Sequence, residues 1–393
     1  MKVTGVRTVL YQIRLNRPLG DVNSPRGRQF SAHLAVFLDS DVGLTGVAIG
    51  GPGARGQIHS LAEELLVGRD PRGVRGLWKK MMDVVFKGGN RGVAGDALAA
   101  LDVALWDLKA KANGEPLWKT LGASSRCVKA YASGLDTPLN DEQLRAYYEG
   151  MARQGVSAGK LKVGLDLEED LRRLGIMEAA LATSGKKPTL MIDSNEYWSP
   201  KQAIRLIRQI EEQFVLTWVE EPARRWDYRG LRQVSRAVRA AVATGENLDD
   251  IGDFVPLIAN EAVDVVEIGQ GASGITGNLM IADLAYAYEL PVAAMNCPGN
   301  LMAHVAAALP NHLMMEVLDA GRAQIMTVDN HIEDGWIVLG DAPGLGIAFD
   351  PDKLAAATVE RPTRESMATP WGRRRGAGLY QVGRDEPEEV GEE

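Results

Sequence analysis

The sequence is poor in cysteine, with only Cys127 and Cys297 in 393 residues. Two cysteines so far apart do not make a disulfide framework, and they suit a reducing compartment. No run approaches the roughly 18 apolar residues of a membrane span. Residues 1–15 alternate like a strand and lack the long apolar core of a signal peptide. These absences predict a cytoplasmic protein with no membrane partner.

Positive charge is also in deficit, because 44 Lys and Arg face 52 Asp and Glu, for a formal net charge of −8. Nucleic acid and anionic membranes are bound by basic faces, so neither is an expected partner. The chain is 45% hydrophobic and 24% charged, which is typical of a soluble globular protein. Its length exceeds one ordinary domain and favours a large barrel with a smaller attached unit.

Residues 1–125 read as strands followed by helices. Residues 3–15 and 33–38 alternate apolar and polar side chains, and DVGLTGVAIGG at 41–51 suggests a hairpin. Residues 95–114 predict a helix with four leucines on one face and Gly114 as its stop. This part of the chain is therefore predicted to be an α+β capping domain.

The polar, Gly- and Pro-rich stretch 14–30 has the composition of a loop, and it is long enough to form a lid. We expect either that one of its arginines binds a distal carboxylate or hydroxyls of a substrate, or that all are solvated loop residues. These arginines are Arg14, Arg17, Arg26 and Arg28.

From 126 to 335 the rhythm changes to eight short β-rich runs, most of them followed by an amphipathic helical stretch. That alternation predicts a modified TIM-type (β/α) barrel as the catalytic domain. Turns and strands return from 336 to 393, and we expect this segment to fold back onto the capping domain. Its acidic end, RDEPEEVGEE, is predicted to be disordered.

Acids stand at the ends of three successive predicted barrel strands: Asp193, Glu220 and Glu246. Barrel enzymes place reactive groups at these strand ends. Three converging carboxylates repel one another unless a cation neutralises them, and oxygen ligands suit Mg²⁺, whereas zinc prefers His or Cys. A single acid here often only caps a helix or forms an ion pair, but three in register with the barrel period favour a magnesium site.

Lys160 and Lys162 lie two residues apart on a predicted strand, so their ammonium groups share a face. We expect mutual repulsion and a nearby dication to lower both pKa values, as a neutral amine base near pH 7 requires. The alternative is a pair of solvated surface lysines. Alternation within SAGKLKVG, with the barrel interior on one side, disfavours that alternative.

The runs KLKVG, MIDSN, WVEEP and ATGEN resemble, in this order, the active-site strands of the enolase superfamily, in its mandelate racemase/muconate lactonizing enzyme-like branch. ALDVALWDLKAKANGEPLWKTLG resembles a helix of that family's first domain. The resemblance implies Lys162 as base and Lys160 as a contact of the substrate carboxylate. It also implies that Mg²⁺ is held by Asp193, Glu220 and Glu246.

Four residues beside these are expected to assist. In WVEEP the resemblance implies that Glu220 is the metal ligand. It implies that Glu221 supports the ligands without contacting the metal. Asn195 is expected to contact substrate, and Asn247 to orient ligands or bound water. Glu316, in LMMEV, matches a position where the branch places an acid near the substrate carboxylate. A helix cap or a salt bridge is an equal alternative for Glu316.

The chain departs from the branch where a second base usually stands. Asn296 takes the place of the usual His on the seventh strand, and no second lysine comes from the sixth. His304 and His312 are interpreted as structural. In place of the usual Asp of the sixth strand, the alignment offers Ile268, Gly269 or Gln270. Asn296 can hydrogen-bond substrate hydroxyls but cannot act as a base.

A single lysine base suffices for β-elimination, whereas racemisation needs proton donors on both faces of the intermediate. We therefore predict Mg²⁺-dependent removal of the proton next to a carboxylate, followed by loss of water from a hydroxy acid or sugar acid. The alternatives are a racemase, epimerase or cycloisomerase of the same superfamily, or an inactive homologue with a binding role. The expected partners are a small-molecule carboxylate and further copies of the chain in a homo-oligomer.

Overall fold

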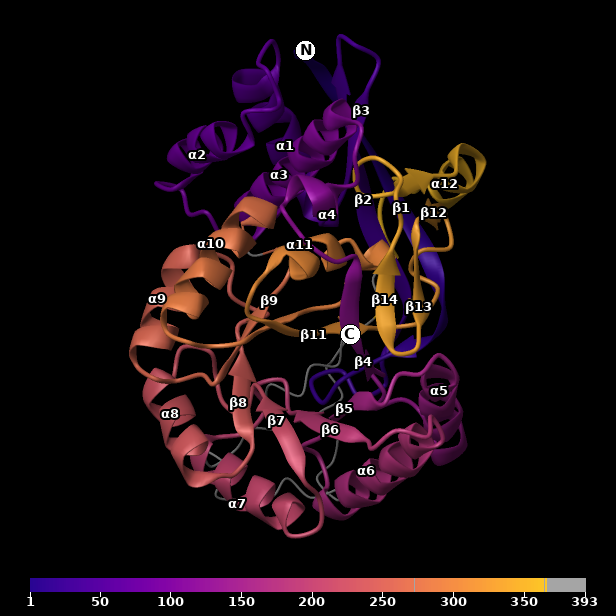
Figure 1. Ribbon diagram of the computed structural model, residues 1–393, viewed down its shortest axis with the longest axis vertical. Coiled ribbons are helices and arrows are strands. Elements are labelled where there is room, and N and C mark those ends of the chain that lie inside the picture. Colours follow the sequence, from indigo (N-terminus) through magenta and orange to yellow (C-terminus); the bar gives the residue numbers. More distant parts are fainter. Residues whose placement is uncertain (272, 364, 366–393) are drawn as a thin grey trace, which may run out of the picture.

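The computed structural model describes residues 1–271, 273–363 and 365. A small unit formed by the first part of the chain lies against one side of a ring of strands and helices, as Figure 1 shows. Among the described residues, no helix has both the length and the apolar content needed to cross a membrane. The acidic end of the chain lies outside the described residues.

The capping unit begins with an antiparallel sheet of β1 (Val3–Leu19), β2 (Arg28–Ser40) and β3 (Thr45–Gly50), in that order. Its longest helix, α3 (Val93–Asn113), is buried on almost every side because it packs between β3 and α10 (Gly274–Ala287). Gly114 ends α3 in the left-handed conformation, as the sequence predicts. The other elements are η1 (Pro52–Ala54), α1 (Arg55–Leu61), η2 (Ala62–Leu66), α2 (Val74–Val85) and α4 (Leu117–Thr120).

The loop predicted over 14–30 is wrong in extent, because β1 continues to Leu19 and β2 begins at Arg28. The register of the two strands shifts between Arg14 and Leu19, so the polar residues fit into an irregular ladder. Leu15 and Leu19 anchor the extension by packing with Ala320. A connection from 20 to 27 remains of the loop that was predicted to be a lid.

All eight predicted barrel strands are present, parallel and in sequence order. The barrel is closed by the pairing of β11 with β4, which puts Met315 opposite Ala130. Its lower interior is filled by side chains that include Tyr131 and Trp218, whose rings meet edge to face. The strands are β4 (Cys127–Ser133), β5 (Ala158–Lys162), β6 (Thr189–Asp193), β7 (Leu216–Glu220), β8 (Ala241–Thr244), β9 (Val265–Ile268), β10 (Val292–Ala294) and β11 (His312–Val317).

Helices cover the outside of the barrel, and side-chain caps fix where several of them begin. Asn140 and Gln143 form a capping box at the start of α5, and Ser199 caps α7. The helices are α5 (Asp141–Arg153), α6 (Leu167–Ala182), α7 (Pro200–Glu211), α8 (Tyr228–Ala237), α9 (Ile251–Ala259), α10, and α11 (Ala303–Ala308) after the short η3 (Pro298–Asn300).

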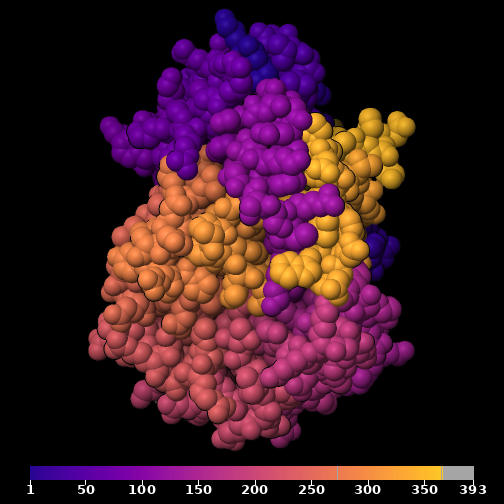
Figure 2. Space-filling model, in the orientation of Figure 1, coloured from indigo at the N-terminus to yellow at the C-terminus, as the bar shows by residue number. Residues whose placement is uncertain are grey.

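The segment after the barrel touches both units and lies where they meet, in yellow in Figure 2. Strand β14 pairs antiparallel with β4 of the barrel. Phe349 packs against Tyr11 and Phe37 of the cap, and Thr358 forms a bridge with Tyr11. The segment contains β12 (Met326–Val328), β13 (Asn330–Glu333), β14 (Trp336–Leu339), β15 (Ile347–Phe349) and α12 (Pro351–Ala357).

Candidate active site

Strand register brings the predicted acids and lysines to one end of the barrel. Lys162 is paired with Asp193 on the next strand, and Asp193 with Glu220 on the one after, so the three lie at one height. Glu246 follows two residues after β8 ends, and Glu316 lies on the closing strand β11. The structure thus gathers residues from strands far apart in the chain.

Both lysines point into this cluster. Lys160 is fully buried: its Nζ contacts Glu220 Oε1 and lies 3.1 Å from Glu316 Oε1. Lys162 is 4% exposed, and its Nζ contacts Asp193 Oδ2. The alternative of solvated surface lysines is therefore excluded.

The expected lowering of the lysine pKa values depends on a dication, and the protein side chains alone have the opposite effect. Burial does favour the neutral amines, but Glu220 and Glu316 beside Lys160, and Asp193 beside Lys162, outweigh it and raise both pKa values. The prediction weighed lysine–lysine repulsion and a dication, and it omitted the direct ion pairs with these acids.

The acids are crowded enough to disturb one another. Burial and the charge of Asp193 raise the pKa of Glu220 to about 8. Burial also raises the pKa of Glu246, against the opposing effect of the two lysines. For Asp193 the lysines prevail over burial, and the pKa of its carboxyl is lowered. The two lysines therefore do not fully offset the burial and mutual repulsion of the acids in this cluster.

The donor set fits a hard divalent cation. Asp193, Glu220 and Glu246 supply only oxygen, and their mutual repulsion would be relieved by a cation between them. No group of three or more acid, His or Cys side chains in the described ranges is arranged to hold a metal directly. Instead the ammonium groups contact Asp193 and Glu220. Binding of Mg²⁺ here requires these side chains to turn toward one another.

Asn195, Glu221 and Asn247 form a hydrogen-bonded group beside the acids. Asn247 Nδ2 donates to Glu221 Oε1 at 2.7 Å, and Asn195 Nδ2 donates to Glu221 Oε2 at 3.4 Å. The backbone N–H of Asn195 donates to Asp193 Oδ1 at 2.7 Å. Asn195 and Glu221 both have positive φ, a costly conformation that concentrates at functional sites. The group holds Asp193 and the turn after it in place.

Glu316 forms an ion pair and does not cap a helix. Its Oε2 accepts a hydrogen bond from the backbone N–H of Asn296 at 3.2 Å and another from Asn296 Nδ2. Burial alone would raise the pKa of Glu316, but Lys160 and Lys162 outweigh it and lower that pKa to about 2. Glu316 is therefore ionised at neutral pH.

Two residues of the site, the half-buried Arg322 and the buried Glu267, were not predicted from the sequence. Arg322, in the loop after β11, donates through Nη2 to Asn296 Oδ1. Glu267, on β9, is fully buried near Glu220, and its pKa is raised well above the usual range by burial and by that acid. The alternation within VDVVEIGQ could have placed Glu267 inside the barrel, but no comparable signal exists for the loop of Arg322.

The lid meets the barrel through an asparagine. Asn23 Nδ2 donates to the backbone oxygen of Asn195 at 2.8 Å. Arg17 lies over the ring of Tyr147, with its Cζ 4.4 Å from the ring centroid, and the side chains of Arg14, Arg26 and Arg28 are exposed.

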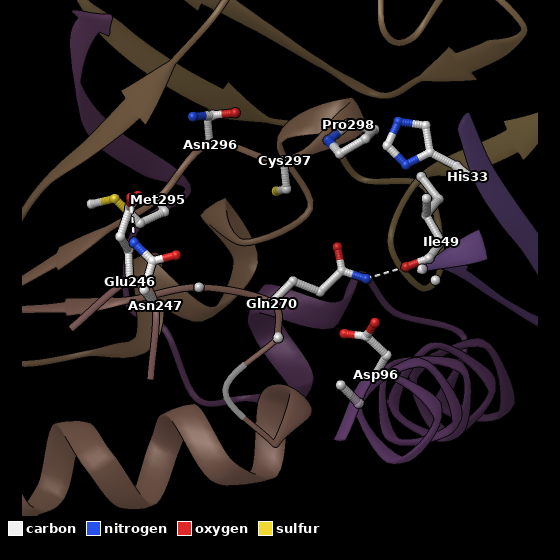
Figure 3. Close-up of a pocket in the computed structure, with 15 residues that line it drawn as sticks. His33, Ile49, Asp96, Glu246, Asn247, Gln270, Met295, Asn296, Cys297 and Pro298 are labelled. Atoms are coloured by element: carbon white, nitrogen blue, oxygen red, sulfur yellow. Dashed lines mark hydrogen bonds between the residues drawn. The ribbon is translucent and has the colours of Figure 1, made fainter. Parts of the chain in front are cut away.

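A cavity of about 340 Å³ opens beside the cluster, between the barrel and the cap. None of the four arginines at positions 14, 17, 26 and 28 lines it. In Figure 3, Gln270 stands between its two sides. One side carries Glu246, Asn247, Met295 and Asn296, and the other carries His33, Ile49 and Asp96.

Two family models match the chain. Residues 143–353 match the enolase C-terminal domain-like family, and residues 28–122 match the N-terminal domain of the mandelate racemase/muconate lactonizing enzyme family. The chain belongs to this family. The resemblance carried by KLKVG, MIDSN, WVEEP and ATGEN is therefore confirmed, as is the modified TIM-type barrel with its cap.

Members of the family with similar sequences are enzymes of acid-sugar metabolism. A 3,6-anhydro-alpha-L-galactonate cycloisomerase of Streptomyces coelicolor is 31% identical, over 90% of this chain and 99% of the relative. An L-talarate/galactarate dehydratase of Salmonella typhimurium is also 31% identical, over 88% of this chain and 89% of the relative.

Solved structures of the family agree in fold. An L-talarate dehydratase from Polaromonas sp. JS666, complexed with Mg and L-glucarate, has a TM-score of 0.82 and 29% identity. It is covered completely by 92% of this chain. A racemase from Streptomyces coelicolor with bound magnesium also has a TM-score of 0.82, with 28% identity over 91% of this chain and all of the racemase. The chain is thus an enzyme of a magnesium-dependent family.

Proposed function

We propose that the protein is a Mg²⁺-dependent dehydratase that removes the proton next to the carboxylate of a hydroxylated acid and then eliminates water. The observation that carries this proposal is the asymmetry of the site. Lys162 contacts Asp193 and is near enough to Glu246 and Glu220 to feel their charge. Asn296, which cannot accept a proton, stands where the family usually has a second base.

The acids Asp193, Glu220 and Glu246 are the residues that would hold Mg²⁺. When bound, the ion stabilises negative charge that develops on the substrate carboxylate. Lys160, with its charge fixed by Glu220 and Glu316, is placed to hold the same carboxylate. Preorganised charges of this kind favour the transition state over the ground state.

Lys162 is placed to take the proton at the substrate's α-carbon once a cation bound at Asp193 offsets the negative charge that otherwise raises the pKa of Lys162. Nζ of Lys162 is almost fully buried, so the proton moves out of contact with bulk water. After the transfer, the same ammonium can deliver that proton to a hydroxyl leaving from the β-carbon on the same face. The product is an enol, which becomes a 2-keto acid.

The relatives support dehydration as the reaction, and they also support isomerisation as an alternative. Similar family members include dehydratases of talarate and galactarate and of arabinonate. The cycloisomerase relative and His33, which lines the cavity, favour isomerisation as the second candidate. Burial lowers the pKa of His33 to about 4, so His33 is neutral at pH 7. A homo-oligomer in the cytoplasm stays a prediction.

The proposed reaction is tested by screening acid sugars for 2-keto acid formation with Mg²⁺ present. We expect the parent to form product and Lys162→Ala to lose at least about a thousandfold in kcat, because it lacks the base. Lys201→Ala, which removes an exposed lysine on α7, serves as the matched control and should retain full activity. Equal product from the parent and Lys162→Ala would exclude Lys162 as the base.

Deuterium oxide separates the two candidate reactions. A racemase or epimerase incorporates deuterium at the α-carbon with inversion and releases no water. The dehydratase yields a keto acid instead. Inverted, deuterated acid without any keto acid would favour the isomerase alternative.

A further inference from the structure

The cavity between barrel and cap extends the reaction centre. Glu246 and Asn296 line its barrel side, next to the lysines, and Asp96 and His33 line its cap side. A substrate whose carboxylate lies near Lys160 can therefore reach into this space with its far end. The side chains that line the cavity determine which chemical group the far end of the substrate can carry.

The charge on the cap side of the cavity is negative. Asp96, in the first turn of α3, is half-buried, and its carboxylate lies against Gly51, where a Cβ would overlap Asp96 Oδ2. Burial and then the charge of Asp249 raise the pKa of Asp96, and no cation or hydrogen-bond donor of the described residues acts in the opposite direction. The Asp96 carboxylate lines the cavity and can accept a hydrogen bond from a bound ligand.

Among the described residues, positive side chains act on this cavity only from outside its lining. Lysine and arginine are both missing from the described residues that line the cavity. His33 is neutral at pH 7, because burial, Arg322 and Arg28 lower its pKa to about 4. The remaining polar lining consists of amides such as Asn247 and Gln270, and the Gln270 Nε2 is already used by the Ile49 carbonyl.

The half-buried Arg322 does not line this cavity, although its charge acts on His33, which does. It donates to Asn296 Oδ1 and lines a neighbouring hollow together with Asp319 and Gly321. The hydrogen bond to Asn296, which lines the cavity, engages one end of the Arg322 guanidinium.

We propose that the far end of the substrate carries a hydrogen-bond donor, either a hydroxyl or an ammonium group, that binds Asp96, and that a second carboxylate is rejected there. This inference rests on the proposed function, because it assumes that the first carboxylate is held at the lysines. It narrows the substrate class to monocarboxylic hydroxy acids.

Matched pairs of acids test the proposal. Six-carbon aldonates and aldarates of the same configuration differ only at the far carbon, which is a CH₂OH in the first and a carboxylate in the second. Aldonates with an amino group at that carbon form a third series. Binding to the Mg²⁺-loaded protein by calorimetry and 2-keto acid formation are measured for the parent and for Asp96→Asn.

We expect the parent to bind the best aldonate or amino acid at least about tenfold more tightly than the matching aldarate, and Asp96→Asn to reduce that ratio about tenfold. If the parent binds the amino-aldonates more tightly than the aldonates, and Asp96→Asn loses this preference, the donor is an ammonium. If the parent binds the two series equally well, the donor is a hydroxyl. Asp249→Asn, which removes a nearby charge outside the cavity lining, is the control and should keep the parent's ratio.

A parent that binds aldarates as well as aldonates, or an unchanged ratio in Asp96→Asn, would overturn the inference. So would the failure of every acid in the three series to bind. Selective binding without keto acid formation would instead contradict the dehydration reaction and leave the charge selection supported.

Discussion

At the scale of single residues, the site is a cluster of buried charged side chains in close contact. Lys160 contacts one acid closely and lies 3.1 Å from Glu316 and 3.5 Å from Asp193, all of them buried. Buried charges are tolerated only when they are paired. A divalent ion added to this group should therefore stabilise the folded state by mass action.

Asp193→Asn tests that coupling. We expect millimolar MgCl₂ to raise the Tm of the parent, with about 2.7 kcal/mol gained at a hundred times Kd. Asp193→Asn should show a much smaller rise, because it loses one negative ligand. Thermal unfolding with and without MgCl₂ is the measurement, and Asp41→Asn, which removes an exposed carboxylate, is the control. Equal shifts in all three proteins would remove Asp193 from the metal site.

The sequence predicted the main residues of the site because strand alternation and the barrel period together place them. Asp193, Glu220 and Lys162 occupy matched register positions. It did not predict the direction of the lysine pKa shifts, since these depend on which atoms pair. Arg322 was missed because nothing in the sequence of a loop encodes its path.

At the scale of elements, the cap owes its compactness to close backbone approach. Strand β3 packs on α3, and Gly46 lies so near the helix that an added Cβ would overlap the carbonyl oxygen of Ala104. Only glycine allows this distance between strand and helix.

Gly46→Ala should therefore destabilise the protein by about 1–3 kcal/mol, because the strand or α3 must move. Gly5→Ala, also on a strand of the cap but with no atom within 4 Å of the added Cβ, should change stability by less than about 1 kcal/mol. Urea unfolding of the parent and both variants gives the free energies. Equal effects of the two changes would contradict the close packing.

The elements themselves were largely predictable. Eight barrel strands follow from short β-rich runs spaced by amphipathic helices, a pattern with few alternatives. The extent of β1 was not predictable, because Leu15 and Leu19 gain their burial from Ala320, some 300 residues later. Local composition indicates a loop there, and tertiary contact overrides it.

At the scale of the whole molecule, His304 links three parts of the chain. The backbone N–H of Trp118 donates to His304 Nδ1 at 3.2 Å, so this nitrogen is unprotonated and Nε2 donates to the Leu345 carbonyl at 3.1 Å. Burial lowers the pKa of His304 to about 4. The structural role predicted for His304 is thus confirmed.

A stability loss in mild acid follows. The folded pKa of about 4 lies below the unfolded value near 6.5, so the stabilisation is complete above pH 6.5 and falls as pH drops toward 4. At pH 5 the loss from His304 is about 2 kcal/mol. Urea unfolding at pH 7 and pH 5 should show a smaller loss by that amount in His304→Gln than in the parent. The same loss in both proteins would contradict this assignment.

The division of the chain at 125/126 and at 335/336 stays a prediction. Gly335 lies in the turn between β13 and β14, so the second boundary falls within a hairpin. Sequence composition changes there, whereas hydrogen bonding does not, since β14 goes on to pair with β4.

Closure of the barrel by β11 has a consequence for how the enzyme acquires its chemistry during folding. Glu316, one of the acids that raise the pKa of Lys160, is carried on the last strand, so a chain that has formed β4 to β10 still has an incomplete reaction centre. Catalytic competence therefore arises only when distant parts of the polypeptide join. During refolding, the return of turnover marks the moment at which the ring becomes continuous.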